Sequence, residues 1–161
     1  MPNDEDSNIR RFQPDFNWEK VERMPYKEEG AAPFKAISRQ ILFSDPALRC
    51  ELRYFEMAID GYSTLERHEH AHAVLILRGA GHCLIGTTVR PVSTYDLVSI
   101  PAMTWHQFRA TQGVPLGFLC MVNAQRDKPQ LPGAEEMARL HAIPEVAAFL
   151  SSTLPNAEPA K

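Results

Sequence analysis

Short apolar segments separated by turn residues fill the middle of the chain, from residue 34 to about residue 124. Several of them alternate apolar and polar positions, as in "CELRYFEMAI", and this period of two is typical of strands with one buried face. Asp45-Pro46, Asp60-Gly61 and Gly113 are among the turn signals between them. Many short strands at near-regular spacing predict an all-β domain, an antiparallel sandwich or barrel. The expected strands are 34–43, 50–59, 72–79, 81–86, 87–92, 96–101, 105–111 and 116–124.

The two ends of the chain have a different texture. Residues 1–33 are rich in Pro, Asp, Glu and Asn without a sustained period, which predicts an N-terminal arm whose aromatic side chains need burial on the barrel or on a partner subunit. Residues 125–161 begin with the Pro-rich connector "QRDKPQLPG" and continue with two short helix candidates, divided by Pro144. The expected organisation is therefore an arm (1–33), a barrel (34–124) and a connector with a short helical tail (125–161). The aromatic residues of the arm are Phe12, Phe16, Trp18 and Tyr26.

Composition narrows the classes of function. A length of 161 residues and 44% apolar content suit one globular domain, and the net charge of -3 with scattered basic residues argues against a nucleic-acid partner. No apolar run is long enough to cross a bilayer, and the start "MPNDEDSN" is acidic where a signal peptide is basic and then apolar, so a cytoplasmic protein without a membrane partner is expected. Cys50, Cys83 and Cys120 are widely spaced, and we expect buried thiols instead of disulfides.

The stretch "ERHEHAHAVLILRGAG" carries histidines at alternate positions. Alternate side chains of a strand share a face, so its ionisable residues can converge if that face lines a barrel. A solvent-facing edge strand would show the same alternation, but Val74 and Ile76 continue the histidine face and indicate that it becomes buried. Imidazole and carboxylate groups bind transition metals, so the stretch predicts a metal site. The candidates are Glu66, His68, His70 and His72, with His106 reaching the site from a neighbouring strand.

Two motifs resemble those of the cupin family. The first runs Gly, a few residues, His-x-His, three or four residues, Glu, six residues, Gly, and the chain matches it over residues 61–79. The second, Gly-x5-Pro-x-Gly followed after two or three residues by His, is similar to "YDLVSIPAMTWHQF": Pro101 and His106 match, whereas Tyr95 and Met103 replace the two glycines. The resemblance implies an antiparallel double-stranded β-helix, or jelly-roll barrel.

The ligand positions of the first motif depart from the family pattern. Counted back from its closing glycine, the family's Glu position falls on His72, its second His on His68 and its first His on Glu66. This exchange keeps three imidazoles and one carboxylate. The resemblance thus implies the ligand set Glu66, His68, His72 and His106, ranked above a set in which His70 replaces Glu66. Outside the ligand set, His70 would support the ligands or carry protons.

Two aromatic residues are candidates for the pocket wall. Phe108 lies two positions after His106 and so shares its face. Tyr54 lies on a predicted strand, but parity alone does not say which face of that strand is inside. No catalytic residue is assigned from the sequence.

The resemblance implies a metal-dependent enzyme acting on a small molecule, first of all an oxidoreductase of the dioxygenase type in which the metal binds substrate and O2. A non-redox isomerase or lyase, and a non-catalytic binding or sensing module, are the alternatives. One divalent transition metal per subunit is expected, iron first, with manganese, nickel or zinc as the other candidates. Cupins often pair through sheet edges and N-terminal arms, so a homodimer is expected.

Overall fold

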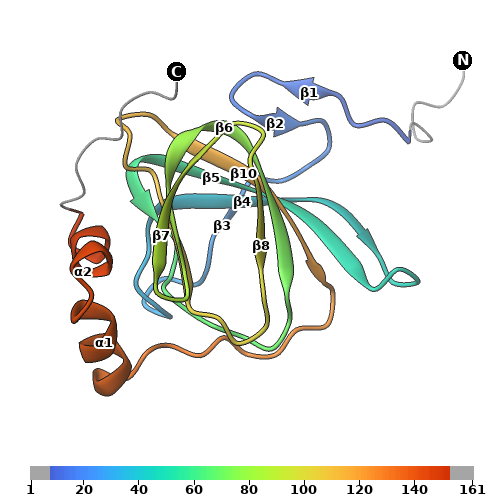
Figure 1. Ribbon diagram of the computed structural model, residues 1–161. Helices are drawn as coiled ribbons and strands as arrows, with labels where there is room; N and C mark the ends of the chain where they lie inside the picture. The colour runs from blue at the N-terminus through green and yellow to red at the C-terminus, as the bar shows by residue number, and fades with distance from the viewer. Residues whose placement is uncertain (1–7, 153–161) are drawn as a thin grey trace, which may run out of the picture.

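The structure, a computed structural model, describes residues 8–152. Its main sheet has eight strands and curls into an antiparallel barrel (Figure 1), which confirms the predicted all-β fold. Strand β5 pairs with β4 and β10, while β6 pairs with β7, β8, β9 and β10. The barrel strands are β4 (Lys35–Asp45), β5 (Cys50–Tyr62), β6 (His72–Ile85), β7 (Thr88–Ser93), β8 (Leu97–Ile100), β9 (His106–Arg109) and β10 (Leu116–Asn123).

The barrel core follows the alternation of the sequence. Val74 and Ile76 of β6 are completely buried, so the histidine face of this strand does turn inward. Phe55 and Met57 of β5 and Phe118 of β10 are buried in the same cluster. Burial of such side chains is worth about 1.5–3 kcal/mol each, and the cluster has members on every strand from β4 to β10.

Strand β6 is longer than the sequence predicted. The segments expected at 72–79 and 81–86 form one continuous strand. The first residues of this strand pair with β8, and its last residues pair with β7. Gly79 lies between the two parts with φ +71°, and an added Cβ there would overlap the carbonyl oxygen of Pro115. A glycine at this bend lets the strand continue across the barrel.

The two residues that replace the glycines of the second motif both have left-handed backbone. Tyr95, between β7 and β8, has φ +76°, and Met103, between β8 and β9, has φ +56°. Their backbone N–H groups donate to the carbonyl oxygens of Ile76 (2.8 Å) and His68 (2.7 Å). The turns are therefore those that glycine would favour, formed here by residues with side chains.

The N-terminal arm packs on the outside of its own barrel. It contains β1 (Phe12–Gln13), β2 (Asn17–Trp18) and β3 (Met24–Pro25), of which β3 pairs with β4. The rings of Phe16 and Trp18 lie 5.7 and 5.0 Å from the ring of Tyr54. These aromatic contacts lie within one chain, and the expected dimer stays a prediction.

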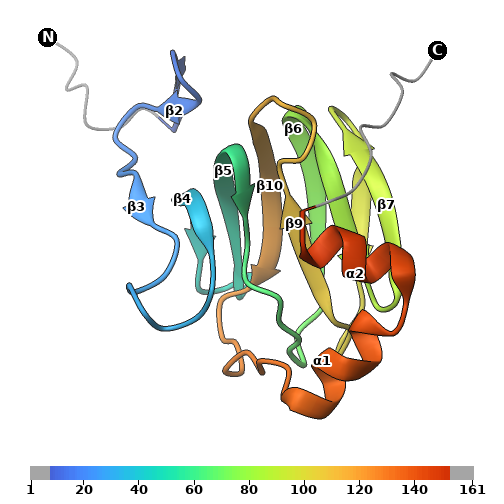
Figure 2. The same cartoon turned by 90° about the vertical axis from the view of Figure 1, so that its left-hand side faces the viewer.

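The C-terminal segment forms the two short helices that the sequence predicted, α1 (Ala134–His141) and α2 (Pro144–Leu150). Pro144 occupies the first turn of α2, where its missing N–H costs no helical hydrogen bond. Figure 2 shows α2 beside β7, with α1 next to α2 at the lower end of the barrel. Val146 and Phe149 are completely buried there in a cluster with Leu84. No helix in the range 8–152 is long and apolar enough to cross a membrane.

Candidate metal centre

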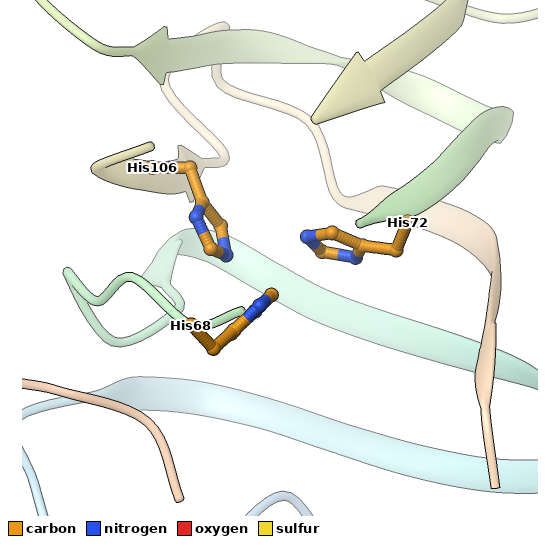
Figure 3. Close-up of side chains that lie close together, drawn as sticks. All are labelled: His68, His72 and His106. Atoms are coloured by element: carbon orange, nitrogen blue, oxygen red, sulfur yellow. The ribbon is translucent and has the colours of Figure 1, made fainter. Parts of the chain in front are cut away.

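Three of the predicted ligands converge at one end of the barrel. His72 begins β6, His106 begins β9, and His68 lies in the segment before β6 (Figure 3). One potential ligand atom from each lies within 4.8 Å of the others. The backbone fixes this arrangement, because Glu66 and His106 exchange two backbone hydrogen bonds of 3.2 and 3.0 Å and so bring two distant segments together.

The ring nitrogens of these histidines suit a metal ligand set. Nδ1 of His68 donates to the carbonyl oxygen of His70 (2.7 Å), and Nδ1 of His106 donates to the carbonyl oxygen of Thr104 (2.9 Å). Each bond fixes the tautomer and leaves the Nε2 lone pair for a metal. Nε2 of His72 is buried without a hydrogen-bond partner. An unpartnered buried nitrogen beside two available ones fits a bound divalent transition metal.

Burial keeps these imidazoles neutral. Burial and, after it, the other histidines of the group lower the pKa of His72 to about 2, and burial is the main cause that lowers the pKa of His106 to about 4. The pKa of His68 is also lowered, mainly by burial and then by His70. A metal binds the neutral imidazole, so the three rings need not lose protons when an ion enters at neutral pH.

The other two predicted ligands lie beside the three histidines but have different partners. Glu66 is buried, and its carboxylate forms an ion pair with Lys27 of the arm. His70 stacks on the His68 ring with 3.6 Å between centroids, and its Nδ1 lies 2.7 Å from Oδ1 of Asp127. That carboxylate accepts hydrogen bonds from backbone N–H groups and from His70, which lower the pKa of Asp127 to about 2. The choice of Glu66 or His70 as a fourth ligand stays a prediction.

The three histidines line a cavity of about 160 Å³. Phe108 lines it, as expected from its shared face with His106. Tyr54 does not: it is completely buried on the opposite face of β5, under the arm, because the inward positions of this strand are Arg53 and Phe55. The parity of β5 was visible in the sequence, but the face that turns inward was not.

The cavity also contains a thiol to which the sequence analysis gave no role beyond packing. Cys120 is 2% exposed, and its Sγ lies 3.1 Å from Nδ1 of His72. Burial raises the pKa of this thiol, and the neighbouring guanidinium of Arg53 opposes the rise. Its alternation with Phe118 and Val122 was a signal for an inward position, but only the pairing of β10 with β6 places it beside His72.

A second group missed by the sequence analysis is cationic. Lys27, Arg39, Arg53 and Arg126 all line the cavity, together with the carboxylates of Glu66 and Asp127. The cations come from the arm, two strands and the segment after β10. Their separation along the chain left no local pattern that could reveal them.

Comparison with known proteins agrees with the fold. A family model described as the cupin domain matches residues 53–122. The chain is 56% identical over 146 residues to 1-methylthio-D-xylulose 5-phosphate methylsulfurylase of Rhodospirillum rubrum, covering 91% of this chain and 94% of that protein.

Solved structures show the same relationship. The structure of a cupin 2 conserved barrel domain protein from Rhodopseudomonas palustris superposes with a TM-score of 0.83 at 55% identity, covering 88% of this chain and 97% of that one. A cupin-2 domain protein from Rhodospirillum rubrum gives 0.81 at 54% identity, covering 90% and 97%. With the barrel, the motifs and these relatives in agreement, the chain belongs to the cupin family.

Proposed function

We propose that this protein removes the methylthio group from a 1-methylthio ketose 5-phosphate, the substrate named for its relative from Rhodospirillum rubrum. The identity of 56% over 91% of the chain supports a shared reaction. The observation that carries the proposal is the thiol of Cys120 in the cavity, 3.1 Å from a histidine of the candidate metal centre. A reaction that moves a methylthio group needs an acceptor for sulfur, and a thiol is one.

The substrate chemistry suits a site with a metal and a thiol. The methylthio group is on C1 of a 2-ketose, so the carbon released from sulfur is next to a carbonyl group that can take up its electron pair. A divalent cation held by His68, His72 and His106 would polarise that carbonyl group. The protein's own part is to hold C1 against Cys120, to keep water out of the buried site and to fix the histidine rings through their backbone hydrogen bonds.

The step balances without an oxidant. Cys120 Sγ bonds to the methylthio sulfur, the C1–S bond breaks with its electron pair left on the ketose, and the thiol proton ends on C1. The products are a 1-deoxyketose 5-phosphate and a methyl disulfide on Cys120. A small-molecule thiol then exchanges with this disulfide, which releases a mixed methyl disulfide and restores Cys120.

The dioxygenase reaction implied by the family resemblance would use the same three imidazoles to bind a metal. It gives no role to a thiol beside the metal centre, and a thiol there is exposed to oxidation by the oxygen that such an enzyme activates. The position of Cys120 therefore favours sulfur transfer over oxygen chemistry.

The first test detects cleavage of the C1–S bond of the substrate. Purified protein, loaded in turn with manganese, iron, nickel or zinc, is incubated with 1-methylthio-D-xylulose 5-phosphate and dithiothreitol, and the phosphate esters are identified by mass spectrometry. We expect a 1-deoxyketose phosphate from the wild-type protein and from Cys50→Ser, whose half-buried thiol does not line this cavity. Cys120→Ser should still bind metal but form no product.

Intact-protein mass spectrometry without added thiol gives a second readout. One methylthio group should add to the wild-type chain and none to Cys120→Ser. Turnover by Cys120→Ser at the wild-type rate, or oxygen consumption that depends on substrate in place of C–S cleavage, would overturn the proposal.

A further inference from the structure

The cations of the cavity outnumber its carboxylates, and two of the four, Lys27 and Arg126, are each hydrogen-bonded to a carboxylate. Lys27 pairs with Glu66. Arg126 donates from Nη1 to Oε2 of Glu51 (3.0 Å) and to the carbonyl oxygen of Asn123 (2.8 Å). Arg39 and Arg53 are the other two, and they belong to β4 and β5 of the barrel wall.

Arg39 and Arg53 each keep an N–H group that has no hydrogen-bond partner. Nε of each is buried and has no hydrogen-bond partner. Nε of Arg53 lies 4.0 Å from Oε2 of Glu51, too far for a hydrogen bond, and within residues 8–152 no carboxylate forms an ion pair with Arg39. A buried N–H of a charged group that has no partner destabilises the folded chain unless a ligand pairs with it. Burial also lowers the pKa of Arg53, which is the effect a bound anion would offset.

The position of these arginines relative to the reacting groups follows from strand pairing. His72, Cys120, Arg53 and Arg39 lie on β6, β10, β5 and β4, which are successive neighbours in the barrel wall (Figure 2). Cys120 is directly opposite Arg53, and Arg39 is opposite Phe55, the next inward residue on β5. Two strand spacings, about 10 Å, separate β10 from β4. The anionic end of a ligand whose other end is at Cys120 would thus lie beside the two guanidinium groups.

We propose that Arg39 and Arg53 form the subsite for a phosphate monoester, with the reacting end of the ligand at Cys120 and the histidines. The identity of the ligand as a ketose 5-phosphate rests on the proposed function, whereas the anionic subsite rests on the two arginines. A guanidinium presents its N–H donors as a planar fork that matches phosphate oxygens, and two such forks can hold a dianion. The subsite would select phosphate esters over free sugars and orient C1 toward the thiol.

Calorimetric titration tests the subsite without turnover. Full-length protein is titrated with D-xylulose 5-phosphate, which lacks the methylthio group, and with D-xylulose. Arg39→Met and Arg53→Met remove the charge while keeping much of the apolar stem, and the exposed Arg90 of β7, outside the cavity, supplies the control Arg90→Met. Because hydrogen bonds to charged groups contribute about 1.5–3 kcal/mol, each cavity variant should bind the phosphate ester roughly ten- to a hundredfold more weakly.

We expect wild type and Arg90→Met to prefer the phosphate ester strongly over the free sugar, and inorganic phosphate to compete with it. Arg39→Lys and Arg53→Lys keep the charge and should retain part of the preference, which separates loss of charge from loss of folding. Equal binding of ester and sugar by the wild-type protein would overturn the subsite. So would an undiminished preference in both methionine variants.

The methylthio substrate separates this inference from the proposed function. If the wild-type protein cleaves it and both methionine variants keep the wild-type KM, the subsite is wrong while the function stands. If nothing is cleaved but binding of D-xylulose 5-phosphate depends on Arg39 and Arg53, the function is wrong and the subsite stands.

Discussion

Replacing Tyr95 with glycine is expected to leave the protein as stable or slightly more stable, although it removes a large side chain. Tyr95 has φ +76°, and a left-handed backbone costs a residue with a side chain roughly 1–2 kcal/mol. The side chain is 80% exposed, so little apolar burial is lost. The extra flexibility of glycine in the unfolded chain offsets about 0.5–1 kcal/mol of the relief. The net expectation is a rise of about 0.5 kcal/mol in the free energy of unfolding.

Urea unfolding at fixed pH in the presence of a thiol measures this change. The matched control is Leu97→Gly, two residues further on, where the side chain is 69% exposed and the backbone is that of a strand. Glycine relieves no strain there, and this variant should lose about 1 kcal/mol. The contrast between the two variants is the prediction. If Tyr95→Gly lowers the free energy of unfolding as much as Leu97→Gly, the strain argument is refuted.

Three further outcomes are expected. Gly117→Ala should lower the free energy of unfolding by about 1–3 kcal/mol in urea titrations, because the new Cβ would overlap the Tyr54 hydroxyl, and an unchanged midpoint would contradict the packing. Burial lowers the pKa of His82 below its usual 6.5, so the folded state holds it neutral while the unfolded state takes up a proton. Neutral His82 therefore costs no stability above pH 6.5, and the free energy of unfolding decreases as the pH falls from 6.5 toward the pKa of His82 in the folded state. His82→Gln removes this proton uptake, so the free energy of unfolding of the variant should change less with pH below 6.5 than that of the wild type. His68→Ala, His72→Ala and His106→Ala should each lower the metal content of untagged protein measured by plasma mass spectrometry, and Glu66→Gln decides whether the carboxylate is a ligand: retained metal argues for three histidines, lost metal for the predicted set of four.

The fold was accessible from the sequence because it rests on local signals. Alternation along the strands, turn residues between them and Pro144 between the two helices each act over a few residues. His68 and His72 were recognisable for the same reason, since their spacing lies within one segment. His106 was proposed from its place on a neighbouring predicted strand and agreed with the family motif, but its approach to the other two depends on hydrogen bonds with a distant segment.

The rest of the site depends on how strands meet, which no local pattern encodes. Cys120 and Arg53 are opposite each other only through the register of β5 with β10. Lys27 reaches Glu66 from a position 39 residues earlier in the chain. Even the parity of β5, correctly visible as alternation, left open whether Tyr54 or its neighbours would face the cavity.

The pairing of Lys27 with Glu66 determines how strongly a bound cation would act. The three imidazoles are neutral, and the carboxylate beside them is balanced by the ammonium group of the arm. A divalent ion held by the three imidazoles alone would therefore keep more of its double charge than one that also binds a carboxylate. Such an ion attracts electron density from a carbonyl oxygen more strongly. In this way Lys27, which reaches the cavity from the arm, would raise the electrophilic strength of an ion held by the three histidines.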